Sequence, residues 1–485
     1  MFLAFLPVIG GAAIVYSILK SPDVLGESPS KSLLSVVGPS SVVATVLGGA
    51  AFSRWLVNAG DGATPFSDWT WWASILQLRL SSLLDPFLPR LVLFFLAAWA
   101  VRIVLSTVWT DVLGAYSRVA GAFSVGAGGK NLVIGTRSTT VALILCLGLA
   151  ALVGAYIYAP AINPTSVLVG VDVKQFYYGA AQTMFGTSPA GALSYALSND
   201  RTAYLLFQYV ISEATGSPDL AIRMMPALLS VLLVVSTFWF TRVATGDDLL
   251  SSTAALFAST SFQVTAGIDG GLYANWLAMV ETFSFFGALL LGLRRKSSRN
   301  LTASAGFSVL LLFTHPWTWF AVMGVVVIYV VSLVMTSRLG RDVGHLRDEL
   351  VFLGAVLLIN LGAEALKRFL PTGTGVEAVY GYTLSGLSPS NIVLVVGALE
   401  STLTSYLAGA LSNPGIVVLG IVGVLTLRNL RSSSSRLLLC WLAAASGGAI
   451  LTGDSAEFLQ SRLLYIIPFQ VFAAIGFVAI LRFAI

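Results

Sequence analysis

Asp172 is the first residue whose type and position could support chemistry. It lies in the run Gly-Val-Asp-Val-Lys-Gln-Phe-Tyr-Tyr of residues 170–178, shortly after the apolar stretch 136–158. A carboxylate beside apolar walls can have its proton affinity tuned for general-base catalysis. The alternative is an ordinary surface acid next to an interfacial Phe/Tyr/Tyr anchor, and spacing alone favours that alternative.

Asp269 is a second candidate acid, in the glycine-rich run Gly-Ile-Asp-Gly-Gly-Leu-Tyr-Ala-Asn of residues 267–275. If Asp269 faces Asp172, the two carboxylates could hold a divalent metal or hydrogen-bond a sugar. A simpler interpretation is a turn in which Asp269 caps the next helix. The sequence has no tight D-x-D or H-x-x-x-H spacing to support a metal, so we expect none.

His315 and Arg462 are candidates of a different kind. His315 precedes Pro316 at the end of a short apolar stretch, where a histidine can be a structural donor or can face a polar ligand. Arg462 lies in the first turns of the last apolar segment, and its fork of donors suits a phosphate. The alternative for Arg462 is a salt bridge with Glu457 or Asp454.

The composition indicates which kind of structural element positions these residues. Of the 485 residues, 56% are hydrophobic and only 10% are charged, against roughly 25% charged in soluble proteins. So few charges could not cover the surface of a soluble fold. We therefore expect an all-α polytopic membrane protein, which excludes a disordered chain, a disulfide scaffold and an outer-membrane barrel.

Apolar segments predict about thirteen membrane-spanning helices, each near the length needed to cross a bilayer. A further apolar stretch, 391–411, is predicted to lie at the surface or to re-enter the membrane without crossing it. The predicted spans are 2–19, 33–56, 88–107, 136–158, 219–243, 249–266, 273–293, 302–314, 317–336, 349–369, 413–428, 437–453 and 461–481.

Lys and Arg residues predict the orientation. They cluster around 294–299, 338–347 and 428–436, and these loops share one side only if 391–411 does not cross. Because basic loops stay in the cytoplasm, the C-terminus is predicted to be cytoplasmic and the N-terminus outside. The long segments 160–218 and 370–412 then lie at the outer face. The net charge of +5 reflects these loops and indicates no nucleic-acid partner.

Several enzyme and pump classes are excluded by missing motifs. The chain contains no P-loop, no G-x-S-x-G and no H-E-x-x-H. We also find no soluble nucleotide-binding domain, which argues against transport ATPases and against enzymes that use cytoplasmic nucleotide sugars.

The chain from 136 to 293, together with 454–468, resembles the GT-C superfamily of integral-membrane glycosyltransferases. These enzymes use polyprenyl-phosphate or polyprenyl-pyrophosphate sugars at the outer or luminal face. The usual acidic pair after the first helix is reduced to one acid here, because Val173 follows Asp172. The matching features are Asp172 with the aromatics 176–178, Thr-Ala-Tyr-Leu-Leu at 202–206, Gly-Ser-Pro-Asp-Leu-Ala-Ile-Arg at 216–223, the polar turn 271–275, and Arg462 with Pro468 six residues on.

The resemblance implies an inverting glycosyltransferase with its site on the outer face. Residues 1–135 would be accessory helices, 136–369 the catalytic module with outer loop 160–218, and 370–485 an outer or re-entrant segment with the C-terminal helices. Asp172 would be the general base, and Arg462, helped by Lys174 and Arg201, would bind the donor phosphate. The substrate would be lined by Tyr177, Tyr178, Asp269, Tyr273, Asn275 and His315.

The implied partners are membrane lipids, a polyprenyl-phosphate sugar such as a dolichyl-phosphate sugar, and an acceptor that is a glycan, a lipid or a protein. No cofactor is expected. Two other functions stay open at this point. One is a transporter or flippase for a lipid-linked or polar solute, although deep charges are few and polar residues concentrate on one face. The other is a non-catalytic subunit of a glycan-assembly complex.

Overall fold

A computed structural model describes residues 136–295, 297–337, 343–370, 414–427, 432–446 and 463–484. All regular elements in these ranges are helices. The predicted accessory spans before residue 136, and the predicted surface helix 391–411, lie outside the described residues.

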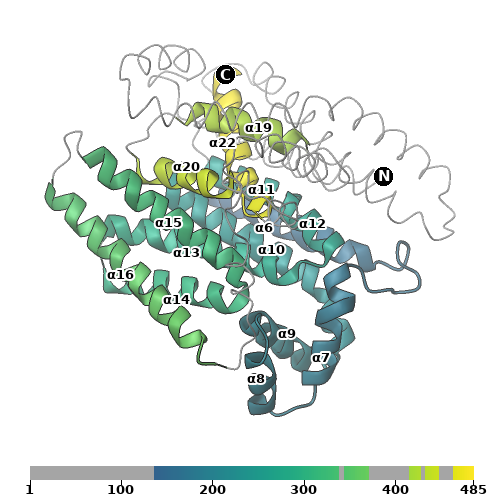
Figure 1. Ribbon diagram of the computed structural model, residues 1–485. Coiled ribbons are helices and arrows are strands. Elements are labelled where there is room, and N and C mark those ends of the chain that lie inside the picture. Colours follow the sequence, from purple (N-terminus) through teal and green to yellow (C-terminus); the bar gives the residue numbers. More distant parts are fainter. Residues whose placement is uncertain are drawn as a thin grey trace, which may run out of the picture.

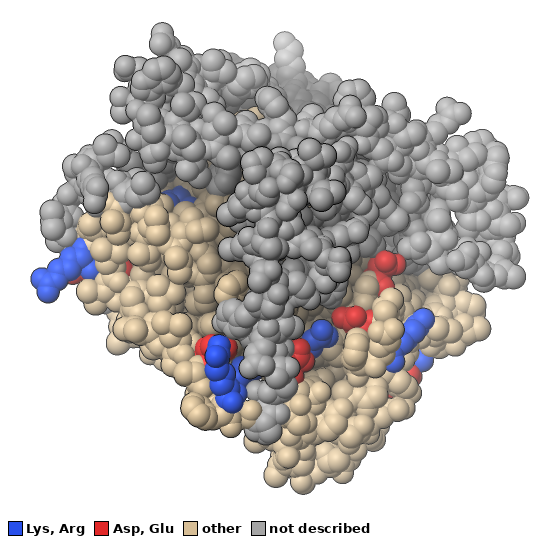
Figure 2. Space-filling view, in the orientation of Figure 1, with Lys and Arg blue, Asp and Glu red and all other residues tan. Residues whose placement is uncertain are grey.

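Five of the described helices are long and apolar enough to cross a membrane. They lie where spans were predicted, which confirms a helical membrane protein, while the total of thirteen spans stays a prediction. Figure 2 shows a largely uncharged described surface with a few small charged clusters. The five helices are α6 (Thr136–Ala155), α10 (Pro218–Thr245), α13 (Tyr273–Arg295), α15 (Pro316–Ser337) and α16 (Val343–Lys367).

The predicted span 249–266 is wrong as a single helix. It consists of α11 (Asp248–Ala258) and α12 (Phe262–Gly270), separated by Ser259-Thr260-Ser261. The Ser259 hydroxyl donates to the Leu256 carbonyl at 2.6 Å. Serine and threonine side chains compete in this way for backbone groups and favour helix ends. The break puts Asp269 in the last turn of α12 instead of at the start of the next helix.

The predicted span 461–481 is also interrupted. After a short turn of helix at 463–465 the chain unwinds at 466–468, and α22 begins at Phe469 and ends at Ala484. Pro468 explains the break, because proline has no amide hydrogen and restricts the residue before it. The Gln263 side chain of α12 donates to the carbonyls of Tyr465 at 2.9 Å and Ile467 at 3.0 Å. The unwound segment is thus held against α12.

The loop between α6 and α10 is built from short helices. Figure 1 shows them grouped at one end of the bundle, next to the last residues of α16. Ser188 caps α8 and Ser217 caps α10 through their side-chain oxygens. Gly216, at φ +67°, ends the helix before α10 in a left-handed conformation. The short elements are η1 (Tyr156–Tyr158), the π-helical turn η2 (Val173–Tyr177), α7 (Tyr178–Met184), α8 (Pro189–Leu197) and α9 (Thr202–Thr215).

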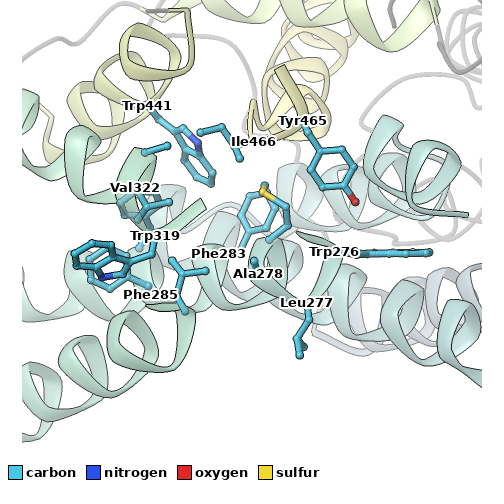
Figure 3. Packing of buried hydrophobic residues seen from close by; sticks show 14 of the residues in the cluster. Trp276, Leu277, Ala278, Phe283, Phe285, Trp319, Val322, Trp441, Tyr465 and Ile466 are labelled. Atoms are coloured by element: carbon cyan, nitrogen blue, oxygen red, sulfur yellow. The ribbon is translucent and has the colours of Figure 1, made fainter. Parts of the chain in front are cut away.

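The core surrounds α13, which is almost completely buried. Aromatic side chains fill the space between this helix and α20 (Ser433–Ser446): the Trp441 ring lies 5.2 Å from Phe283 and 4.6 Å from Phe286 between centroids (Figure 3). Buried polar contacts join α14 (Ser298–Thr314) to its neighbours. Asn360 of α16 accepts from the Trp319 indole and donates to Ser308, each at 2.8 Å.

At the end of the bundle opposite the short helices, Arg294 closes the C-terminus of α10. It donates to the carbonyl of Val243, to that of Ala244 at 3.1 Å and to the Ser434 hydroxyl at 3.0 Å. An arginine here complements the negative end of a helix. The contacts bring together helix ends that were predicted to share the basic side. Which side of the membrane this is stays a prediction.

The pair α19 (Pro414–Thr426) and α22 offers a stability test. A Cβ on Gly423 would lie 1.8 Å from the Phe472 carbonyl oxygen, whereas a Cβ on Gly420 finds its nearest neighbour at 3.7 Å. Gly423→Ala is expected to destabilise the protein by about 1–3 kcal/mol, because backbone must move. Gly420→Ala, the matched control, should be neutral or stabilising, since alanine favours helix. The measurement is the melting temperature of each variant in detergent. Equal melting temperatures for the two variants would contradict the close approach of α19 and α22.

Candidate functional site

Two turns that are far apart in sequence touch through glycines. Gly170 has φ +100°, and a Cβ there would lie 2.5 Å from the Gly271 Cα. Gly271 has φ +69°, and a Cβ there would lie 2.9 Å from the Val173 amide nitrogen. Only glycine combines positive φ with so close a backbone approach. This contact brings the turn of Asp172 against the turn that joins α12 to α13, so the two predicted segments share one end of the bundle.

Asp172 lies in the first turn of a helical run that continues to residue 184. An acidic residue is favourable there because it faces the positive end of the helix. Its Oδ2 lies 3.6 Å from an Arg201 nitrogen, and the side chain is 15% exposed. Oδ2 itself is buried and accepts no hydrogen bond. The carboxylate is therefore held by charge while one of its oxygens keeps free acceptor capacity.

Arg201 is the cation of this site, and it directly precedes α9. It donates a hydrogen bond to the Tyr177 hydroxyl and lies 3.9 Å from an oxygen of Asp200. Burial lowers the pKa of Arg201, but the neighbouring Tyr177, Asp200 and Asp172 raise it by more, so its pKa is raised overall. Arg201 was predicted to bind phosphate. In the structure it links Asp172 to Tyr177, and phosphate binding by Arg201 stays a prediction.

Tyrosine rings pack together next to Arg201, the partner of Asp172. The Tyr177 ring stacks on Tyr273 at 6.0 Å and 6° and lies 4.6 Å from Tyr204. All three side chains are buried, and Gln208 donates to the Tyr177 carbonyl at 2.7 Å. Burial raises the pKa of Tyr204 well above its ordinary value, and nearby Tyr177 adds to the shift. Tyr204 is therefore a neutral phenol at physiological pH.

The remaining residues predicted to contact substrate differ in accessibility. Lys174, two residues after Asp172, is exposed, and Tyr178 is half-buried. Asp269 is exposed at the end of α12, whereas Asn275 is buried in the first turn of α13. Asn275, like Tyr273, therefore lies within the core.

His315 lies deeper along the bundle. It is buried after the last residue of α14, and its Nδ1 lies 2.8 Å from the Thr318 hydroxyl. The preceding Thr314 donates at 2.7 Å to Glu281, which is eight residues after Tyr273 in α13, or about 12 Å along the helix. His315 thus lies at the depth of Glu281, where its contacts shape the break between α14 and α15.

Lys367, at the end of α16, was not singled out from the sequence. Its side chain is buried, and Nζ donates to the carbonyls of Leu312 at 3.1 Å and Asp200 at 3.4 Å. The lysine therefore joins the ends of α14 and α16 to the segment that carries Arg201. No local signal reveals this role, because Lys367 lies 167 residues beyond Asp200.

A metal site finds no support in the part of the chain that the structure describes. No group of three His, Cys, Asp or Glu side chains gathers there in a way that could hold an ion. Arg462, the predicted phosphate ligand, lies outside the described residues, and its role stays a prediction.

The described residues define a helical membrane protein with a polar site at one end of its long helices. No family model and no curated protein matches the chain. Among solved structures it is similar to the oligosaccharyltransferase of Archaeoglobus fulgidus: 12% identity and a TM-score of 0.45 for the apo form, with 70% of this chain and 50% of that chain covered.

Two further structures of an oligosaccharyltransferase from the same archaeon are also similar to the chain. The complex with zinc and sulfate gives 13% identity and a TM-score of 0.42, covering 69% of this chain and 48% of that one. The complex of AglB with an inhibitory peptide and a dolichol-phosphate gives 13% identity and a TM-score of 0.44, covering 70% of this chain and 50% of that one. The chain spans about half the length of these structures. Likenesses this distant leave the function to be argued from the residues themselves.

Proposed function

We propose that this protein is an inverting glycosyltransferase that takes a sugar from a polyprenyl-phosphate donor at the outer face of the membrane. The observation that carries the proposal is the Asp172 carboxylate. It sits where the helices end, it is oriented by Arg201, and its Oδ2 accepts no hydrogen bond. The resemblance of the surrounding sequence to the GT-C superfamily supplies the reaction class.

In the proposed reaction an acceptor hydroxyl attacks the anomeric carbon of the lipid-linked sugar. The bond from oxygen to carbon forms, the bond from that carbon to the phosphate oxygen breaks, and the configuration inverts. Asp172 takes the hydroxyl proton as general base. The lipid phosphate departs as an anion, so no acid is needed to protonate it. Glycoside hydrolysis differs, because it uses a pair of carboxylates.

The negative charge of the departing phosphate must be stabilised by positively charged side chains. Arg462 is the proposed main ligand, with Lys174 and Arg201 as helpers. Lys174 is exposed beside Asp172, whereas Arg201 already pairs with Asp172 and Tyr177. We therefore assign Lys174 to the phosphate and Arg201 mainly to the orientation of the base. Asp269 and Tyr178, which have exposed surface near the same end, are proposed to contact the sugar.

Binding of polyprenyl phosphate, the lipid product, tests this function without knowledge of the sugar. A ligand at 100 times its Kd stabilises the native state by about 2.7 kcal/mol, so the melting temperature of the purified protein should rise. The rise should vanish in Arg462→Ala and persist in Arg223→Ala, where the lost arginine pairs with Asp219. Polyprenol without phosphate is the matched ligand control. No rise in folded wild-type protein would overturn the monophosphate donor.

A further inference from the structure

Lys367 is a buried lysine in the last turn of the long apolar helix α16, and only 4% of its surface is exposed. A buried ammonium group destabilises a fold unless hydrogen bonds or opposite charges compensate it. Here Nζ donates to the carbonyls of Leu312 at 3.1 Å and Asp200 at 3.4 Å. It also lies 5.5 Å from the centre of the Phe313 ring. The proposed reaction does not use this cation, so its place needs another explanation.

The Leu312 carbonyl explains why a donor is needed at this point. In a continuous helix the amide of residue 316 would donate to the carbonyl of residue 312. Residue 316 is a proline, which has no amide hydrogen, and the helix breaks between α14 and α15. An unpaired carbonyl at membrane depth is costly. Lys367 supplies the donor that Pro316 lacks, and it places a positive charge at the negative end of α14.

The second carbonyl belongs to the turn that carries Arg201. Asp200 directly precedes Arg201, and Arg201 is the N-cap residue of α9. One ammonium group therefore joins the end of α14, the end of α16 and the start of α9, which lie next to one another in Figure 1. Arg201 lies 3.6 Å from Asp172 and donates to the Tyr177 hydroxyl. The position of the Asp200 carbonyl thus limits where the guanidinium of Arg201 can lie.

We propose that Lys367 is a positioning residue for Asp172. It anchors the turn of Arg201 to the membrane helices, and Arg201 in turn orients the carboxylate. Its effect on transfer rests on the proposed function, whereas the anchor itself does not. Methionine has a similar length but offers no hydrogen to either carbonyl, so Lys367→Met removes the anchor. Arginine keeps the charge and the donors in a different, planar arrangement, so Lys367→Arg restores the anchor in part.

The distance between two spin labels tests the anchor without any substrate. Both native cysteines are buried, so the labels attach to introduced cysteines. The sites are Val210→Cys on α9, 58% exposed, and Leu358→Cys on α16, 70% exposed. In vesicles, Lys367→Met is expected to broaden the distribution of distances between the labels, and Lys367→Arg to broaden it less. Arg368→Met is the matched control and should leave the distribution unchanged, since the Arg368 side chain is 57% exposed and pairs with a carboxylate of its own helix.

The same distribution in Lys367→Met as in the wild type would overturn the anchor. If Lys367→Met does not fold, Lys367→Gln takes its place with the same expectation, because its shorter amide cannot reach both carbonyls.

Kinetics connect the anchor to the proposed reaction. A reacting group misplaced by about 1 Å can lose roughly 10²-fold in rate, so the kcat per folded molecule of Lys367→Met should fall by about 10–100-fold. The KM and the melting shift caused by polyprenyl phosphate should persist, and Lys367→Arg should recover part of the kcat. Broadened distances with a wild-type kcat would overturn the positioning role. Broadened distances in a protein whose wild type transfers no sugar would contradict the proposed function and leave the anchor standing.

Discussion

The Asp172→Asn variant is expected to lose sugar transfer while it keeps its fold. Asparagine has nearly the same shape, but its amide cannot take a proton from the acceptor hydroxyl. A general base contributes roughly 10²–10⁴-fold to a rate, so the turnover should fall by a factor in that range. The protein should still fold, because Oδ2 accepts no hydrogen bond that the change would break, and Arg201 keeps Asp200 and the Tyr177 hydroxyl as partners.

The measurement is the initial rate of transfer from a polyprenyl-phosphate sugar in vesicles, together with melting and polyprenyl-phosphate binding. Asp219→Asn is the matched control, since Asp219 is an acid with a 44% exposed side chain that pairs with Arg223 at 2.8 Å one helical turn away. It should retain transfer. Full activity of Asp172→Asn would end the assignment of Asp172 as base. Retained lipid binding without any transfer in the wild type would favour a non-catalytic subunit.

The sequence predicted the parts of the site that depend on local pattern. Asp172 stands out because a carboxylate and three aromatics follow the end of an apolar span, and the positions of the long helices follow from hydropathy alone. Glycines in the Asp172 and Asp269 runs were visible too. Their role was not, because a contact between Gly170 and Gly271 requires knowledge of which turns meet.

Contacts over long sequence distances could not be predicted from one sequence. Lys367 reaches the carbonyl of Asp200, and Gln263 holds the chain around Tyr465. Neither residue belongs to a motif, and each acts through a backbone carbonyl that any residue type provides. The burial of Tyr177, Tyr273 and Asn275 was missed for a related reason, since an aromatic or amide side chain near a helix end suits a binding surface and a core equally well.

Breaks within apolar runs were missed because hydropathy does not measure backbone geometry. The stretch 249–266 is uniformly apolar enough for one span, yet three hydroxyl residues at 259–261 divide it. Pro468 divides the last predicted span in the same way. Both breaks meet at the start of α12, the helix that ends at the turn of Gly271, because the unwound chain at 466–468 packs on Gln263. Helix breaks are tolerated in membrane proteins where other groups satisfy the freed backbone, as Gln263 does here.

Gly170→Ala is expected to damage both stability and transfer. The residue has φ +100°, which costs an L-residue roughly 1–2 kcal/mol. The new methyl group would also lie 2.5 Å from the Gly271 Cα and 2.7 Å from its nitrogen, and separating two backbones costs about 1–3 kcal/mol more. We therefore expect a loss of about 2–5 kcal/mol of stability and, in the molecules that remain folded, a displaced Asp172.

The variant Gly186→Ala distinguishes the cost of the positive φ from the cost of separating the two backbones. It has φ +70°, but a Cβ there would meet nothing within 4 Å. Gly186→Ala should therefore show only the backbone cost, about 1–2 kcal/mol, with transfer retained. The difference in melting between the two variants then measures the contact between the Asp172 turn and the Gly271 turn. If Gly170→Ala and Gly186→Ala melt alike and both transfer sugar at the wild-type rate, the close packing of these turns does not position the base, and the geometry proposed for Asp172 is wrong.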